Sequence, residues 1–369
     1  MKNSFVSPRH MAPVPVVTSA ATAPTPARAA SSALADVDPR FGLLKVLGSI
    51  GVVVVHSTAE RVNDVDMDHV GWWLANISNA AGRYGSAIFV MVSGALLLAR
   101  HSEDKPVEFV RQRFARLLPM IVFWSLFYFA WRALRGADIT WESAAKDVVQ
   151  GMPSYHLWFV YMMLGLYLMA PALRMLVRSP RHRPVQYYAL AICAALTCTE
   201  AATQTLQQTM HASFIGLSPL FIVYFLGGYL LYRDRPRLPY ALLWNVPLAS
   251  VAAMAIGVAL LDKRLGDWAF VLFYSNRAPF AMALTFCLFL AVLRVPQNHA
   301  LLRCSQPLAR ISLGIYGVHP FWIDALEMLG CGPTHFESAW VVPAAAAYVL
   351  SAATAYGLSQ VTGLRRVVQ

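Results

Sequence analysis

Ten long apolar segments constrain this chain more than any other feature of its sequence. Each has roughly 18–25 residues, enough for a helix to span the hydrocarbon core of a bilayer. Only 13% of the 369 residues are charged, about half of what an ordinary soluble domain carries. Because backbone polar groups must be paired in lipid, the sequence predicts an all-α polytopic membrane bundle of about ten transmembrane helices. The segments lie at 41–59, 74–99, 117–134, 155–176, 185–203, 214–232, 240–261, 268–293, 308–328 and 339–363.

The second segment is the least regular of the ten. Asn76, Asn79 and Arg83 lie in its first part, and such side chains are costly in hydrocarbon. The membrane-embedded portion of this segment is therefore expected to begin near Tyr84.

The positive charges predict the orientation of the bundle. The net charge is +11, and most Lys and Arg residues fall on one side when successive loops are assigned to alternate sides. That side also holds both termini, and cytoplasmic loops are the ones that carry excess Lys and Arg. Both termini are therefore expected in the cytoplasm, and the positive charge needs no nucleic-acid partner.

Three regions follow from this reading. Residues 1–39, rich in Ala, Pro, Ser and Thr, are expected to form a disordered cytoplasmic tail. Residues 40–363 form the membrane domain, and residues 364–369 form a short cytoplasmic C-terminus.

The first segment holds the most informative polar side chains. Lys45 and His56 are eleven residues apart, which places them on one face of a helix, about three turns apart. Glu60 follows His56 by four residues, near enough to accept a hydrogen bond from the imidazole and orient it as a general base. A purely structural pairing of His56 with a neighbouring helix is the open alternative.

A cluster of arginines precedes the third segment. Arg113 and Arg116 lie three residues apart in FVRQRFARLLP, and on a helix they point the same way. Guanidinium groups match phosphate geometry. Contact with lipid headgroups is the alternative, and spacing does not decide between the two.

Two further histidines lie near the outer side. His156 and Trp158 begin the fourth segment, where an aromatic belt would account for Trp158 and for Tyr155. His319 lies in the ninth segment beside Pro320, which frees a backbone carbonyl and bends the helix. A kinked polar position of this kind is typical of a helix that lines a cavity.

Arg277, in the outer half of the eighth segment, needs a partner at that depth. Asp324 and Glu327 are the acidic candidates on the same side. The five cysteines show no metal-type spacing, and the sequence contains neither an HExxH nor a GxSxG motif. No metal site is predicted.

Six segments together resemble one known family, the integral-membrane acyltransferase-3 family, and within it the branch of surface-glycan O-acetyltransferases. They occur in family order across about residues 40–363. The segments are Lys45 to His56, FVMVSGALLL at 89–98, FVRQRFARLLP at 109–119, HLWFVYMMLGLYLMAPALR at 156–174, YFLGGYLL at 224–231 and LGIYGVHP at 313–320.

The resemblance implies transfer of an acyl group, usually acetyl from cytoplasmic acetyl-CoA, to a hydroxyl of a saccharide or lipid-linked glycan at a bacterial inner membrane. His56 matches the family's catalytic histidine, and Arg113 and Arg116 match its paired arginines, implicated in handling the acyl donor. Lys45 stands where the family has arginine, keeping the charge but not the guanidinium fork. Ser93 and Gly94 match a serine-glycine pair.

A transporter or flippase for a glycan or small anion is the competing interpretation, because intramembrane His, Arg and acidic residues also suit a transport pathway. The sequence shows no inverted internal repeat of the kind many carriers have. A non-catalytic membrane scaffold is a third interpretation. The acyltransferase hypothesis assigns catalysis to His56 and Glu60, donor binding to Lys45, Arg113 and Arg116, and acceptor binding to His156, Trp158, Arg277 and His319.

Overall fold

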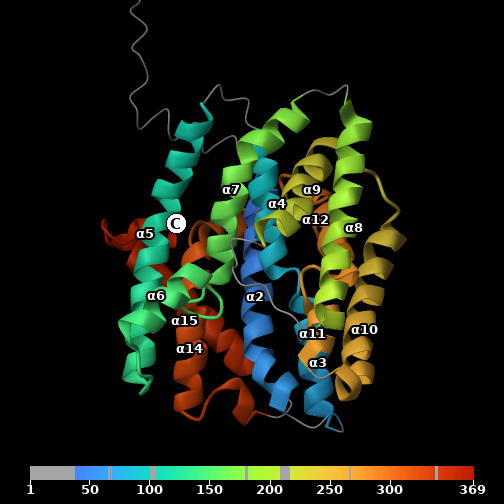
Figure 1. Ribbon diagram of the computed structural model, residues 1–369. Helices are drawn as coiled ribbons and strands as arrows, with labels where there is room; N and C mark the ends of the chain where they lie inside the picture. Colours follow the sequence, from blue (N-terminus) through green and yellow to red (C-terminus); the bar gives the residue numbers. More distant parts are fainter. Residues whose placement is uncertain are drawn as a thin grey trace, which may run out of the picture. The chain divides into compact units, whose positions relative to one another are not determined.

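The computed structural model describes residues 38–369 except 65–66, 68, 100–104, 179–181, 208–216, 266 and 337–339. The predicted tail at 1–39 therefore lies almost wholly outside the described residues. Eight segments are helical, long and apolar enough to cross a membrane, which confirms the predicted all-α polytopic membrane bundle (Figure 1). They are Arg40–Asn63, Val70–Leu98, Pro106–Leu134, Trp158–Val177, Arg183–Gln207, Tyr240–Leu261, Trp268–Leu293 and Val341–Gln360.

The helices follow one another with short connections. In chain order they are α2 (Arg40–Asp64), α3 (Val70–Gly82), α4 (Gly85–Leu98), α5 (Pro106–Leu134), α6 (Trp141–Gln150), α7 (Trp158–Val177), α8 (Arg183–Gln207), η2 (Ser218–Phe221), α9 (Ile222–Asp234), α10 (Tyr240–Leu265), α11 (Asp267–Tyr274), α12 (Pro279–Leu293), α13 (Ala300–Arg310), α14 (Ser312–Met328), η3 (Pro333–His335), α15 (Val341–Gln360) and α16 (Arg365–Val368).

Two of the ten predicted spans are shorter than expected. The segment at 214–232 becomes α9, with 13 residues, and the segment at 308–328 becomes α14, with 17 residues. Both are largely buried by neighbouring helices. Their apolar sequence therefore reflects burial inside the protein as much as contact with lipid, and hydropathy does not separate the two.

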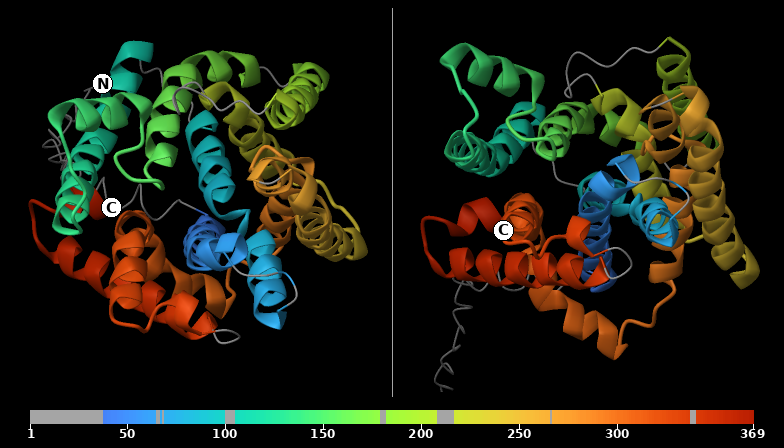
Figure 2. Two further views of the ribbon diagram at one scale, coloured as in Figure 1. Left: turned by 60° about the horizontal axis from the view of Figure 1, so that its bottom comes forward. Right: turned by 90° about the horizontal axis from the view of Figure 1, so that it is seen from below.

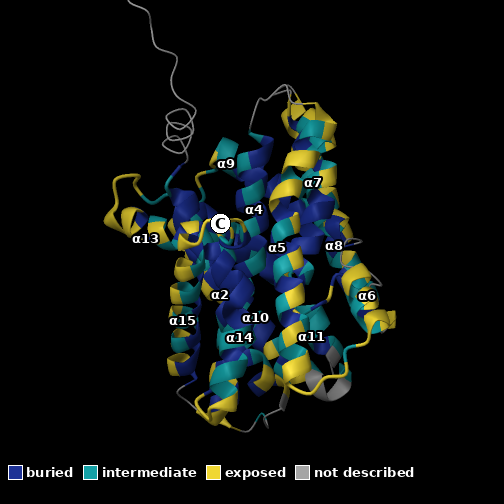
Figure 3. Ribbon diagram, turned by 90° about the vertical axis from the view of Figure 1, so that its left-hand side faces the viewer, coloured by how far each residue is buried: buried dark blue, intermediate teal, exposed yellow. Residues whose placement is uncertain are grey.

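Helix α2 lies among α3, α4, α13, α14 and α15, and it can be followed in blue in both views of Figure 2. Most of α2 and α4 is buried, whereas α6 and α13 expose much of their surface (Figure 3). Most of the surface of α2 is therefore enclosed by packing on several sides.

The irregular second span is broken, and Arg83 and Tyr84 lie between α3 and α4. The expectation that its membrane-embedded portion begins near Tyr84 stays a prediction. Glycines bring this break against α2: a Cβ on Gly85 would lie 2.6 Å from the backbone nitrogen of Val52, and one on Gly51 would lie 2.9 Å from the carbonyl oxygen of Gly82. Small residues allow such close backbone approach between membrane helices. The close packing fixes Arg83 beside the C-terminal half of α2.

Helices α4 and α9 cross equally closely. A Cβ on Gly94 would overlap the Phe225 carbonyl oxygen at 1.8 Å, and one on Gly228 would overlap the Met91 carbonyl oxygen at 2.1 Å. Gly94 of the serine-glycine pair thus serves packing.

The chain ends against the bundle. Helix α16 packs on α5, α14 and α15, and Val367 and Val368 are buried. The indole Nε1 of Trp124 on α5 donates to the Val367 carbonyl at 3.1 Å. The residues predicted as a short C-terminus are therefore an integral part of the packed domain.

Candidate active site

Three histidines that are far apart in the sequence meet inside the bundle. His56 comes from α2, His156 from the turn before α7, and His319 from α14. The His319 ring centroid lies 5.2 Å from that of His56 and 5.3 Å from that of His156. His156 and His319 are buried, whereas His56 is partly accessible. We call these three residues the histidine cluster.

Pro320 determines the hydrogen bonding of His319. Proline has no N–H, so the carbonyl of Tyr316, four residues earlier, receives no helical hydrogen bond from it. His319 Nδ1 lies 2.8 Å from that carbonyl oxygen. Because a carbonyl can only accept, the proton is assigned to Nδ1, which leaves Nε2 as the acceptor of the neutral ring. No described residue hydrogen-bonds this buried Nε2.

His156 is held in a similar way. Its Nδ1 lies 3.1 Å from the Ser154 hydroxyl, and its ring packs edge-on against Tyr128 at 4.9 Å. The hydroxyl of Tyr316 donates to the backbone carbonyl of His156. Its Nε2 is buried and also makes no hydrogen bond within the described part of the chain. Two buried imidazoles thus keep one ring nitrogen available.

His56 contacts aromatic rings rather than the predicted carboxylate. The Tyr155 ring lies 5.0 Å away, and no described residue forms a hydrogen bond with the His56 ring. Glu60 is exposed one turn further along α2, within electrostatic range of Tyr155. The orienting role of Glu60 stays a prediction.

The predicted donor residues gather about the opposite part of α2. Lys45 is partly buried within electrostatic range of Arg116, which is exposed on α5. The Arg113 guanidinium lies 5.2 Å from the Phe109 ring centroid. Tyr167 on α7 lies within electrostatic range of both arginines. The three cations that the sequence assigned to the donor therefore share one region.

The two groups are separated along α2. The eleven-residue step from Lys45 to His56 corresponds to about 16 Å of helix. A ligand that contacted both groups would have to reach deep into the bundle.

The other two predicted acceptor residues have different surroundings. Trp158 packs on Phe221 of η2, with ring centroids 5.6 Å apart. The Arg277 Nε donates to the Ser275 hydroxyl at 3.1 Å, and Glu200 on α8 is within electrostatic range.

The suggested pairing of Arg277 with Asp324 or Glu327 is wrong. Asp324 forms an ion pair with Arg135 at 3.0 Å. Glu327 accepts from Thr334 and lies 3.1 Å from the Nδ1 of His335. Both acids interact with residues in the connections that follow α5 and α14. The hydropathy of the spans does not predict such contacts with connecting residues.

Two features escaped the sequence analysis. Tyr155, assigned to an aromatic belt, and Tyr128 instead surround the histidine cluster.

The second feature is a pocket of about 590 Å³ at the end of α9, which we call the α9 pocket. It is lined by arginines that the sequence analysis used only to predict the orientation of the bundle. Its lining residues are Arg233, Asp234, Arg235, Pro236, Arg237, Leu290, Leu293 and Arg294.

The cluster has the groups needed for proton transfer. A neutral imidazole accepts a proton at its free nitrogen, and histidine is the commonest general base in enzymes. Among the described residues, no group of three or more His, Cys, Asp or Glu side chains is placed to hold a metal ion.

Comparison with known proteins identifies the family. The family model described as an acyltransferase domain matches residues 38–360, most of the chain. Searches of curated proteins and of solved structures gave no significant match. The matched range contains the histidine cluster and the basic residues on α2 and α5. The chain belongs to the integral-membrane acyltransferase-3 family.

Proposed function

We propose that this multi-pass membrane acyltransferase moves an acetyl group from cytoplasmic acetyl-CoA to a hydroxyl of a cell-envelope or exported saccharide. The histidine cluster inside the bundle is the observation that carries the proposal, because it places His56, which resembles the family's catalytic histidine, next to the His319 imidazole. The proposed location is a bacterial inner membrane, with both termini in the cytoplasm.

His56 would act as the general base. It accepts the proton of the acceptor hydroxyl while the oxygen attacks the thioester carbonyl, so that a C–O bond forms and the C–S bond breaks. The proton then passes to the departing thiolate, which leaves an ester and free CoA thiol. The free nitrogen of His319, 5.2 Å away from His56 between ring centroids, supports this assignment by providing a neutral, polar neighbour.

The donor would bind with its phosphates at Lys45, Arg113 and Arg116. Its thioester then has to extend about 16 Å along α2 to reach His56. The acceptor would approach from the other end of α2, at His156 and His319, with Trp158 and Arg277 as further candidate contacts.

The first test is transfer of label from radiolabelled acetyl-CoA to a glycan acceptor by the purified protein. His56→Ala is expected to lower kcat by roughly 10²–10⁴-fold, the usual contribution of a general base. Size-exclusion elution and thermal midpoint serve as folding controls. Wild-type transfer rates in a folded His56→Ala protein would contradict the proposal. Acceptor flux across vesicles without labelling would instead favour a carrier.

The second test concerns the donor site. Arg113→Gln and Arg116→Gln should each raise the KM for acetyl-CoA by roughly ten-fold, the loss expected for a charge-assisted hydrogen bond, with little change in kcat. Arg235→Gln in the α9 pocket is the matched control. If only the control variant raises this KM, the donor phosphates bind in the α9 pocket.

A further inference from the structure

Arg83 is a partly buried charged side chain inside the bundle. It lies in the break between α3 and α4, and its Nε donates to the Asn79 side-chain oxygen at 2.9 Å. Its Nη2 donates to the same oxygen, and the guanidinium stacks on the Tyr274 ring at 4.5 Å. These partners fix the direction of the guanidinium.

None of these partners neutralises its charge. Asn79 is a neutral amide and Tyr274 an aromatic ring, and the Arg83 guanidinium forms no ion pair or further hydrogen bond with the described residues. Nη1 is left without a described acceptor. An arginine inside a membrane domain is costly and usually pairs with an anion or faces a polar cavity. Within the described residues, the bundle supplies a cavity beside Arg83 but no anionic partner.

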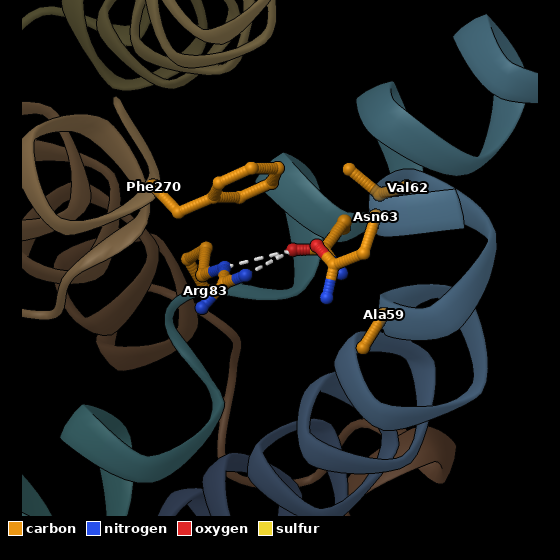
Figure 4. Close-up of a pocket in the computed structure, with 6 residues that line it drawn as sticks. Ala59, Val62, Asn63, Arg83 and Phe270 are labelled. Atoms are coloured by element: carbon orange, nitrogen blue, oxygen red, sulfur yellow. Dashed lines mark hydrogen bonds between the residues drawn. The ribbon is translucent and has the colours of Figure 1, made fainter. Parts of the chain in front are cut away.

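A cavity lies one helical turn along α2 from His56 of the histidine cluster. It has a volume of about 310 Å³ and opens beside the guanidinium (Figure 4). Its lining residues are Ala59, Val62, Asn63, Asn79, Arg83 and Phe270. We call it the Arg83 pocket.

The position of the Arg83 pocket on α2 relates it to the proposed chemistry. Ala59 lies one turn beyond His56, about 4.5 Å along the helix axis. Arg83 itself lies within electrostatic range of the His56 ring. A volume of about 310 Å³ is at the small end of ligand sites and suits a single sugar unit or its charged substituent.

We propose that the Arg83 pocket binds an anionic group of the acceptor, a sugar carboxylate or phosphate, and thereby positions a nearby hydroxyl at His56. This inference rests on the proposed acyl transfer and adds the charge class of the acceptor. The guanidinium offers the fork that carboxylates and phosphates share, and Asn63 offers an amide group for a sugar hydroxyl.

The test is direct binding to the purified full-length protein in detergent, measured by isothermal titration. The probes are methyl glucuronide, glucose 1-phosphate and neutral methyl glucoside. A charged probe is expected to bind at least about ten-fold tighter than the glucoside, and Arg83→Gln should abolish that preference. Tighter binding of methyl glucuronide than of glucose 1-phosphate would indicate a carboxylate-bearing acceptor, and the reverse order would indicate a phosphate-bearing one.

A second pair of variants guards against misfolding of Arg83→Gln. Asn63 is exposed at the rim, so Asn63→Asp should weaken the charged probes about ten-fold by repulsion, while Asn63→Gln should not. Equal binding of charged and neutral probes by the wild type, or an unchanged preference in Arg83→Gln and Asn63→Asp, would overturn the inference. Binding requires no acyl transfer, so its outcome is separate from that of the labelling assay.

Discussion

At the scale of single residues, the chemistry of the site depends on what surrounds each histidine. His56 could be selected from the sequence because it matches a motif and lies in an apolar segment. Its meeting with His156 and His319 could not, since it depends on how α2, α7 and α14 pack. From the sequence, Arg83 could be recognised only as a charged residue within an apolar segment. Its contact with Asn79 could not be predicted, because the sequence does not show which side chains face it.

Pro320 offers a prediction at this scale. Pro320→Ala restores a backbone N–H that competes with His319 Nδ1 for the Tyr316 carbonyl. We expect kcat for acyl transfer to fall by roughly 10- to 100-fold as His319 loses its orientation. The thermal midpoint should stay unchanged or rise, because alanine favours helix.

Pro247→Ala, in the interior of α10, is the matched control and should keep wild-type kcat. A Pro320→Ala enzyme with full activity would show that the tautomer assigned to His319 does not matter to the reaction.

At the scale of elements, apolar runs specify where the helices lie in the sequence, whereas close backbone contacts specify which helices pack together. Hydropathy located the helices and the polar start of the second span. It did not anticipate that α5 begins at Pro106, which puts Arg113 and Arg116 on the helix itself, nor that α9 and α14 are short. Helix pairing is instead decided by small residues whose partners the sequence does not identify.

The α4–α9 contact gives an element-scale prediction. Gly94→Ala places a Cβ on the Phe225 carbonyl, so the helices must separate, and overpacking of this kind costs roughly 1–3 kcal/mol. The thermal midpoint of the purified protein should fall. In Gly357→Ala, with no atom within 4 Å of the new Cβ, it should not. Equal midpoints for the two variants would mean that the close α4–α9 crossing is not needed for stability.

At the scale of the whole molecule, the proposed reaction depends on orientation in the membrane. The lysine and arginine excess of alternate loops predicts that α13 lies on the cytoplasmic side and the α14–α15 connection on the outer side. Two native cysteines report on this arrangement. Cys304 on α13 and Cys331 after α14 are exposed, whereas the other three cysteines are buried or partly buried.

A membrane-impermeant thiol reagent applied to spheroplasts should therefore label Cys331 at once and Cys304 only after the membrane is permeabilised. Cys331→Ser should abolish the first signal and Cys304→Ser the second. The reverse order would place Arg113 and Arg116 outside the cell, away from cytoplasmic acetyl-CoA. In that case the donor assignment would fail while membership of the acyltransferase family would stand, because the family match does not depend on which side the loops face.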